Sequence, residues 1–215
     1  VDVALQRSEV VKYLARDGTA ILNKDDELSS ALGKHLSTKN IYKFGLSQNS
    51  EYYACGIEHL GPQGTSFTLN NKFQVNIPVY SISDVYNFLA ATAALDALDF
   101  PINRIIEIFQ KDYQLPAGRG KLHKLNGFYV IDESYEATTR SIAKASRAMT
   151  GFKPYTNKLV YILGDMTEYG PNIEEHHLNM GYFLSALPID CLITVGNYAS
   201  YTGKGFSLIH SKENL

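Results

Sequence analysis

The sequence predicts an α/β protein made of two consecutive units, and three observations lead to this prediction. Two apolar runs, residues 128–131 and 159–163, end abruptly in acidic or small residues, as buried parallel strands do at the carboxyl edge of a sheet. Strand-like and helix-like segments alternate in both halves of the chain. Residues 73–79 alternate apolar with polar side chains, which is typical of a half-exposed strand. Ligands of α/β proteins bind at the carboxyl edge of the sheet, so function is expected at these strand ends.

The first unit begins with a helix–strand–helix pattern. Apolar spacing predicts a helix over residues 4–14, a short strand over 19–22 and a second helix over 27–36, which the acidic pair Asp25-Asp26 precedes. Four short strands are expected next, separated by turns rich in Gly, Pro and Asn: 41–46, 52–58, 65–69 and 73–79. These four strands predict a half-exposed antiparallel layer.

Two helices close the first unit. They are expected over residues 84–98 and 102–111, and the second carries Ile102, Ile105, Ile106 and Phe109 at the spacing of one buried face. Residues 114–120 then contain a proline and two glycines in a short span, which makes them the best candidate for a junction between units.

The second unit is predicted to be a further α/β unit with a mostly parallel sheet. Its expected strands are 121–125, 128–131, 159–163 and 191–195, its expected helices are 139–149 and 173–187, and a strand-like segment over 206–209 comes last. Because the chain opens at Val1 without an initiator Met and ends soon after that segment, we expect a piece of a longer protein.

Composition excludes several classes of function. The 215 residues are 45% apolar, and 20 basic against 22 acidic residues give a formal net charge of −2, so there is no bulk attraction to nucleic acid or to an anionic membrane. The sequence contains no signal segment and no apolar run that could span a bilayer. Cys55 and Cys191 stand far apart within apolar runs, which indicates buried, reduced thiols and a cytoplasmic protein.

Candidate chemistry has to come from scattered residues, because the sequence lacks P-loop, CxxC, HExxH and GxSxG motifs. Arg119, between Gly118 and Gly120, could bring its guanidinium close to a phosphate or carboxylate, although a solvated linker residue is the plainer interpretation. Asp132-Glu133 could bind Mg²⁺ or orient a substrate, or could simply precede a helix.

Asp165 and Glu168 are equally ambiguous, with nearby glycines that allow close approach of a ligand. His176-His177 have no neighbouring metal ligands in the sequence, which favours a surface or capping role. The tyrosines, including Tyr80, Tyr86, Tyr135 and Tyr169, are interpreted mainly as interface and core residues.

Five segments, in chain order, resemble motifs of the Mur ligase family: Gly18-Thr-Ala-Ile-Leu-Asn-Lys-Asp-Asp26, Ser83-Asp-Val-Tyr-Asn-Phe-Leu-Ala-Ala91, Gly118-Arg119, Ile131-Asp-Glu-Ser-Tyr135, and Leu163-Gly-Asp-Met-Thr-Glu-Tyr-Gly170 followed by His177 and Gly181. The resemblance covers nearly the whole chain. The last motif is fairly specific to the branch that joins D-alanyl-D-alanine to UDP-N-acetylmuramoyl-tripeptide.

The resemblance implies the later part of a central ATP-binding domain, residues 1–116, with a mixed sheet, an antiparallel layer and helices. A Rossmann-like C-terminal domain, residues 117–215, would follow and would be incomplete. The phosphate-binding loop and the UDP-binding domain would lie outside the chain, so the fragment alone would be inactive. The implied reaction is ATP-dependent ligation through an acyl phosphate in peptidoglycan precursor synthesis, with ATP and Mg²⁺, by a cytoplasmic monomer.

Site residues are carried over from the family motifs position by position. Asn87 matches the asparagine that contacts adenine, Arg119 the arginine that reaches the nucleotide phosphates, and Glu133 an aspartate that contacts the nucleotide. The substrate-binding positions implied are Ser134, Tyr135 and Asp165. No catalytic residue is assigned, and the metal ligands are unknown.

Several positions depart from the family pattern. They are Arg7 in place of a carbamylated lysine, Ser83 and Asp84 in place of His-Asn, and Glu136 and Thr138 in place of two asparagines. Arginine cannot be carbamylated in that way, although its fixed charge could replace that of a metal ion. These departures keep two alternatives open: a ligase for another acid and amine, and a non-catalytic relative that binds a nucleotide or a partner.

Overall fold

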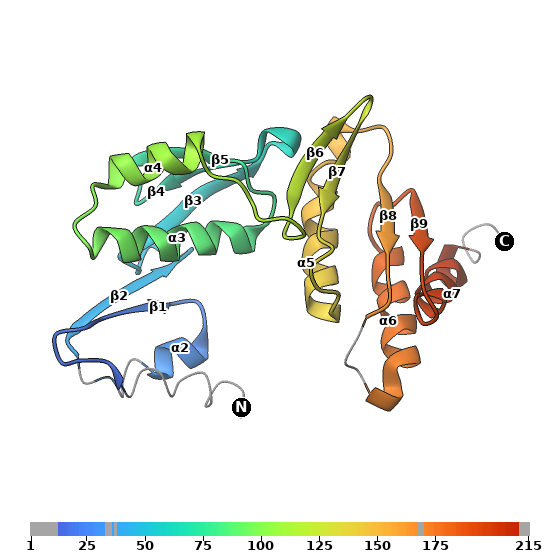
Figure 1. The fold of residues 1–215 in the computed structure, drawn as a ribbon, viewed down its shortest axis with the longest axis horizontal. Coiled ribbons are helices and arrows are strands. Elements are labelled where there is room, and N and C mark those ends of the chain that lie inside the picture. The colour runs from blue at the N-terminus through green and yellow to red at the C-terminus, as the bar shows by residue number, and fades with distance from the viewer. Residues whose placement is uncertain (1–12, 33–35, 37, 167–169, 211–215) are drawn as a thin grey trace. The chain divides into compact units, whose positions relative to one another are not determined.

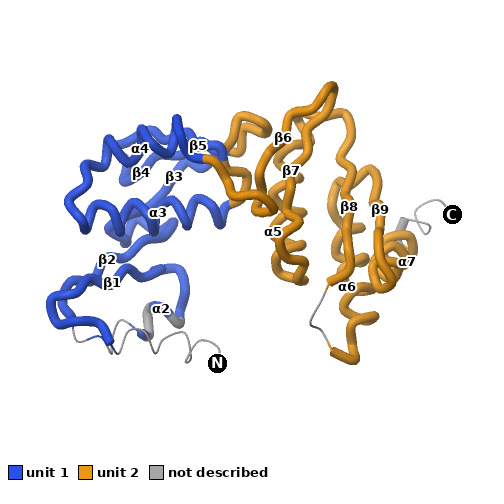
Figure 2. The backbone as a smooth tube through the Cα atoms, in the orientation of Figure 1, with its two compact units in different colours: residues 1–58, 65–78, 82–113 blue, residues 59–64, 79–81, 114–215 orange. Residues whose placement is uncertain are grey.

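The computed structural model describes residues 13–32, 36, 38–166 and 170–210. Arg7, Glu168 and most of the predicted helix over 4–14 therefore lie outside the described residues. The chain forms two compact units: residues 1–58, 65–78 and 82–113 make unit 1, and residues 59–64, 79–81 and 114–215 make unit 2 (Figure 2). The predicted domain boundary between residues 116 and 117 stays a prediction.

Unit 1 is built on one five-stranded sheet with the strands in chain order: β1 (Thr19–Asn23), β2 (Asn40–Gly45), β3 (Tyr52–His59), β4 (Thr65–Leu69) and β5 (Phe73–Ile77) (Figure 1). β1 pairs with β2, and β2 with β3, in parallel, whereas β4 and β5 are antiparallel. The sheet is therefore mixed.

The expectation that the residue 41–79 strands form an antiparallel layer was wrong for β2 and β3. Phe44, near the end of β2, pairs with Tyr52, the first residue of β3. The end of β2 therefore pairs with the start of β3, and the two strands run in the same direction. For β5 the predicted alternation is confirmed, because Val75 and Ile77 are buried whereas Gln74 is exposed.

Helices α2 (Glu27–Leu32), α3 (Ile82–Asp96) and α4 (Ile102–Lys111) complete unit 1. Phe88 of α3 contacts Phe67 of β4 and Phe109 of α4 edge to face, with ring centroids 5.3 and 5.0 Å apart. Val85 and Leu89, on the same face of α3, are fully buried. The apolar stripe of α3 thus fixes which of its residues face away from the core, Asn87 among them.

Unit 2 contains two separate two-stranded sheets. β6 (Lys121–Leu125) and β7 (Phe128–Asp132) form an antiparallel hairpin around Asn126-Gly127, where Gly127 has φ +87°. β8 (Val160–Leu163) and β9 (Cys191–Thr194) pair in parallel. The prediction of one mostly parallel sheet was therefore wrong for the described residues, in which the hairpin has no hydrogen-bonded partner strand.

Helices α5 (Thr139–Thr150), α6 (Ile173–Ser185) and α7 (Ala199–His210) belong to the same unit (Figure 1). The core of unit 2 gathers buried residues of α5, β8, α6 and the loops around them: Ile142, Tyr161, Leu163, Met166, Met180, Leu184 and Ile189. The strand expected over residues 206–209 was wrong, since this segment is the end of α7. Apolar runs of four residues occur in strands and helices alike, and the preceding Gly203 and Gly205 hid the helix.

Residues 59–64 and 79–81 join unit 2 through aromatic contacts. Tyr80 lies 5.5 Å from Phe152 between ring centroids, and a short 3₁₀ turn at Gly61–Gln63 lies against the ring of Tyr155. A side chain at position 61 would collide with that ring, and Gly61 also has φ +54°.

Both cysteines are free thiols, and each is partly exposed, so the prediction of full burial was wrong. Among the described residues, no helix is both long enough and apolar enough to cross a bilayer.

Candidate functional site

Two turns of unit 2 are joined by the carboxylate of Asp132, the last residue of β7. Oδ2 accepts a hydrogen bond from the backbone N–H of Gly118, and Oδ1 accepts one from that of Ser134, both at 3.1 Å. Gly120 N–H donates to the Asp132 carbonyl at 2.8 Å, and Tyr135 N–H donates to the Gly118 carbonyl at 3.1 Å. Hydrogen bonds from the side chain and backbone of Ser134 lower the pKa of Asp132, which keeps it ionised.

Gly118 and Gly120 allow these turns to approach each other. Gly118 has φ +72°, and a Cβ there would lie 2.9 Å from the backbone nitrogen of Tyr135. Gly120 has φ +88°, and its Cβ would lie 3.1 Å from Oε1 of Glu133. Both glycines are buried, whereas Arg119 between them is exposed. The backbone is thus fixed at the two positions that flank the charged side chain.

The guanidinium of Arg119 lies over the ring of Tyr135, with Cζ 3.9 Å from the ring centroid. In the described part of the chain, no carboxylate forms an ion pair with Arg119. The structure therefore brings together four predicted residues, Arg119, Glu133, Ser134 and Tyr135. A planar guanidinium fork at the surface, held by fixed backbone, suits a phosphate or carboxylate ligand.

Asn87 lies on the exposed face of α3 in unit 1, one residue after a tyrosine that the sequence did not single out for the site. The Tyr86 hydroxyl donates to Oδ2 of Asp25 at 2.8 Å, and the backbone N–H of Leu46 donates to the same oxygen at 2.6 Å. Burial and the Asp25 carboxylate raise the pKa of Tyr86 to about 12. Asp25 thereby connects the loops after β1 and β2 to α3. The resemblance of residues 18–26, which end in Asn-Lys-Asp-Asp, to a Mur ligase motif could have indicated this connection.

Asp165 has a structural role at the start of α7. Its carboxylate accepts backbone N–H groups of Asn197 at 3.0 Å, Tyr198 at 2.9 Å and Ala199 at 2.6 Å. Gly196 precedes these residues with φ +130°, and a side chain there would collide with Asp165. Such an arrangement satisfies N–H groups that a helix N-terminus leaves unpaired. A role for Asp165 in substrate binding stays a prediction.

His177 is fully buried, so its interpretation as a surface or capping residue was wrong; His176 is partly exposed. Nε2 of His177 accepts the backbone N–H of Met166 at 3.0 Å, and Nδ1 lies 2.9 Å from Oγ1 of Thr202. Because Nε2 accepts, Nδ1 carries the proton and donates to Thr202. Burial lowers the pKa of His177 and keeps the ring neutral.

Gly181 allows α6 and α7 to cross closely. A Cβ at this position would lie 2.8 Å from Cα of Gly205 and 2.7 Å from the backbone nitrogen of Phe206, and would also collide with the Thr202 carbonyl. Asp165, Met166, His177 and Gly181 thus join the loop after β8 to α6 and α7. Asp165 and His177, the polar residues of this last motif that the structure describes, form hydrogen bonds within the protein.

Comparisons with known proteins identify the same family throughout. Residues 2–95 match the model of the Mur ligase middle domain. A UDP-N-acetylmuramoyl-tripeptide–D-alanyl-D-alanine ligase of Buchnera aphidicola is 27% identical over 221 residues, which cover 99% of this chain and 47% of that ligase. The resemblance to the Mur ligases is confirmed. The chain spans less than half the length of the curated relatives it matches along its length.

Solved structures of Mur ligases share the fold. A crystal structure of MurF from Acinetobacter baumannii aligns with a TM-score of 0.83 and 25% identity, covering 96% of this chain and 44% of that one. A MurF ligase from Thermotoga maritima in complex with ADP aligns with a TM-score of 0.77 and 18% identity, covering 93% of this chain and 45% of that one. The α/β fold of a Mur ligase is thus confirmed.

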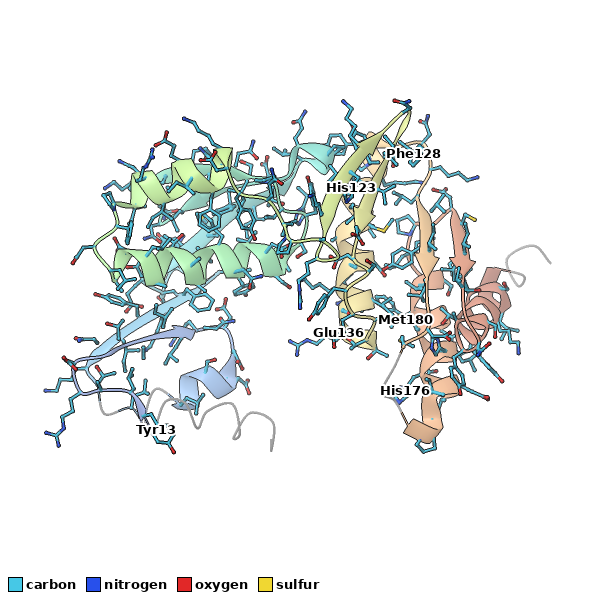
Figure 3. The ribbon with its side chains drawn as sticks, in the orientation of Figure 1. Tyr13, His123, Phe128, Glu136, His176 and Met180 are labelled. Carbon is cyan, nitrogen blue, oxygen red and sulfur yellow. The ribbon has the colours of Figure 1, made fainter. Side chains whose placement is uncertain are left out.

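Some departures from the Mur ligase pattern have local structural roles. Thr138 caps α5 in a capping box with Ser141: Thr138 Oγ1 accepts the Ser141 N–H, and Ser141 Oγ accepts the Thr138 N–H. Glu136 is exposed in the turn that leads into α5 (Figure 3). Asp84 lies in the first turn of α3, where a negative charge is favourable. Nothing in the structure explains Ser83.

The described residues include no group of three or more His, Cys, Asp or Glu side chains arranged to hold a metal ion. Mg²⁺ in phosphoryl-transfer enzymes commonly takes only one or two carboxylates and completes its shell with water and phosphate oxygens. Asp132 is already occupied by two backbone N–H groups, so it is poorly suited as a ligand. The metal ligands stay unassigned.

Proposed function

We propose that this chain is part of an ATP-dependent ligase that joins D-alanyl-D-alanine to UDP-N-acetylmuramoyl-tripeptide in peptidoglycan precursor synthesis. Similarity along nearly the whole chain to ligases named for this activity supports the proposal. The observation that carries it is the exposed Arg119 held between two buried glycines and tied to the strand end at Asp132. That arrangement presents a cation at the surface beside the end of β7, where its guanidinium fork can bind an anion.

Arg119 is proposed to hold nucleotide phosphates through the N–H donors of its guanidinium edge, and Asn87 to contact the adenine. Glu133 replaces an aspartate and is longer by one methylene, and it is proposed to keep a contact with the nucleotide. In the reaction, a substrate carboxylate oxygen bonds to the γ-phosphorus and ADP leaves. The amine then forms a bond to the acyl carbon and phosphate leaves. Arg119 would stabilise negative charge in the first step.

Mg²⁺ is proposed to accompany ATP and to neutralise the phosphate charge. The acid and amine substrates are proposed to lie near Ser134, Tyr135 and Asp165, which are carried over from the family motifs. The protein is proposed to act as a monomer in the cytoplasm, with neither nucleic acid nor membrane as a partner.

A ligase for another acid and amine is the second candidate. A diaminopimelate-adding ligase of Geobacillus thermodenitrificans is 28% identical over 147 residues, which cover 67% of this chain and 29% of that ligase. Glu133 and Glu136, which stand where the family pattern has an aspartate and an asparagine, also distinguish this chain. A non-catalytic relative is the third candidate.

The decisive experiment measures phosphate release by the full-length protein with ATP, Mg²⁺ and UDP-N-acetylmuramoyl-tripeptide. It is run with D-alanyl-D-alanine and without an amine, and a separate arm supplies UDP-N-acetylmuramoyl-L-alanyl-D-glutamate as the acid and diaminopimelate as the amine. Release that requires D-alanyl-D-alanine supports the proposal. Release that requires diaminopimelate selects the second candidate, and no release under any combination, with ATP binding retained, favours the third.

Arg119→Ala tests the residue that carries the proposal. We expect Mg-ATP affinity, measured by calorimetry, to fall about tenfold or more, as for the loss of one charge-assisted contact. Arg104→Ala is the matched control, since Arg104 is also exposed and forms an ion pair with Glu107 on the surface of α4. Equal affinities for the two variants would make Arg119 a solvated linker residue.

A further inference from the structure

Tyr135 contacts Arg119 in a way that leaves the hydrogen-bonding edge of the guanidinium free. Cζ of Arg119 lies over the ring of Tyr135, 3.9 Å from the ring centroid, so the guanidinium contacts the face of the ring. The N–H donors of a guanidinium point outward in its plane, and stacking on a ring consumes none of them. A carboxylate partner would instead occupy these donors and compete with an incoming anion.

The backbone fixes the ring in this position. Tyr135 N–H donates to the Gly118 carbonyl, and Asp132 accepts N–H groups from both Gly118 and Ser134. The two turns are therefore cross-linked on either side of the Arg119–Tyr135 pair. Tyr135 as a residue is 65% exposed, so its contact with Arg119 is made at the surface, where a ligand can reach it.

We infer that Tyr135 is a positioning residue that holds the Arg119 guanidinium by its face and presents its donor edge to an anion. An unsupported arginine at the surface samples many rotamers and loses that freedom when it binds a ligand. A ring that already restricts the side chain reduces this loss, which increases affinity without a direct contact to the ligand. The inference rests on the proposed function, since nucleotide phosphates are the anion proposed for Arg119.

The test is a double-mutant cycle on Mg-ATP affinity in the full-length protein, measured by calorimetry. Tyr135→Leu removes the aromatic face and keeps an apolar side chain, and we expect affinity to fall about two- to fivefold, as for an exposed cation–π pair. Tyr135→Phe keeps the ring and should restore most of the affinity. In the Arg119→Ala background, Tyr135→Leu should have no further effect.

Tyr129→Leu serves as the matched control, because Tyr129 lies on β7, the strand that leads into the turn with Tyr135, and is also partly exposed. It should leave Mg-ATP affinity within error. A second readout follows the pair itself: ring currents should shift the Arg119 side-chain proton resonances upfield, and Tyr135→Leu but not Tyr135→Phe should abolish the shift.

Three results would overturn the inference. Tyr135→Leu could weaken binding by the same factor with and without Arg119, which would make Tyr135 a direct ligand contact. It could leave affinity unchanged while Arg119→Ala weakens binding, in which case the proposed function of Arg119 stands without a positioning role for Tyr135. If Arg119→Ala itself has no effect, the proposed phosphate contact fails and the inference fails with it.

Discussion

Asp132 ends one strand of unit 2 and Asp165 follows another, and both carboxylates accept backbone N–H groups, yet they hold different parts of the unit in place. Asp132 binds the turn that presents the exposed Arg119. Asp165 binds the first residues of α7, and the next residue, Met166, is fully buried. An acidic residue at a strand end can therefore hold an exposed turn in place or support the packing of a helix. The burial of the neighbouring residues separates the two cases.

The region around Asp165 is part of the core. Met166 packs among buried residues of β8 and α6, and His177 accepts its backbone N–H. The region around Asp132 is partly solvated, and its hydrogen bonds join turns on the surface. Substitutions in the Asp165 region should therefore reduce stability, whereas those in the Asp132 region should reduce ligand affinity.

Gly181→Val should have the largest effect on stability. The new side chain would collide with the backbone of α7 at Thr202, Gly205 and Phe206, and backbone cannot move aside as a flexible side chain can. We expect a loss of about 3 kcal/mol or more in the free energy of unfolding, or failure to fold. Urea unfolding followed by circular dichroism measures it.

Gly203→Ala is the control for this prediction. It adds a methyl group to α7 where the nearest atom outside the helix, Oγ1 of Thr194, would be 3.5 Å away, an ordinary contact. Stability should be unchanged or should rise by up to about 1 kcal/mol, because alanine favours a helix. Similar losses in both variants would show that α6 and α7 do not cross closely at Gly181.

Asp165→Ala should cost about 2 kcal/mol of unfolding free energy. It removes the acceptor of three backbone N–H groups at the start of α7, together with a negative charge that favours the N-terminal end of a helix. Chemical denaturation measures the change. If the predicted substrate contact also exists, the KM for UDP-N-acetylmuramoyl-tripeptide should rise as well, whereas a change in stability alone would leave Asp165 a helix cap.

His177 makes the stability of the same region dependent on pH. Its pKa is lowered in the folded protein by burial, and nearby His176 acts in the same direction, whereas the Asp165 carboxylate opposes this. Above the unfolded pKa of about 6.5, His177 is neutral in both states and the full stability is present. As pH falls through that value, the unfolded chain binds a proton that the folded protein resists, so stability decreases.

Thermal unfolding at pH 7.5 and pH 5.5 measures this dependence. Comparison with His177→Gln isolates the contribution of one histidine, because glutamine can accept the Met166 N–H without titrating in this range. The variant should lose less stability than the parent between the two pH values. An identical decrease in both proteins would assign the pH dependence to other groups.

The sequence predicted most helices and strands because their periodicity is local. α4 was predicted with its observed bounds, since its apolar face repeats at helical spacing and Pro101 marks its start. The wrong predictions concern how strands pair and how helices pack, and both depend on residues far apart in the sequence. Whether β2 and β3 run in the same direction depends on how the short loop between them folds, and the helix over residues 199–210 depends on its contact with α6 and its cap at Asp165.

The site was predictable only in part, for the same reason. Two of the segments that resemble Mur ligase motifs supplied four of the predicted site residues, Arg119, Glu133, Ser134 and Tyr135. The structure brings these two segments together. The sequence could not show that Tyr135 stacks on Arg119, because that contact depends on the φ angles of two glycines. Burial of His177 was also hidden, since histidine pairs occur on surfaces and in cores alike.

Asp132→Ala should have the smallest effect on stability and the clearest effect on the ligand. Water can replace the carboxylate at the N–H of exposed Ser134 but less readily at that of buried Gly118, so we expect a loss of about 1 kcal/mol in unfolding free energy. Without the cross-link, the turn that carries Arg119 is no longer fixed, and Mg-ATP affinity should fall about tenfold. Denaturation and calorimetry on the same sample separate the two quantities, and Asp165→Ala should show the larger stability loss.

If Asp132→Ala instead unfolds the protein and leaves nucleotide affinity intact in the folded fraction, both aspartates are packing residues, and the distinction between their neighbourhoods does not predict function.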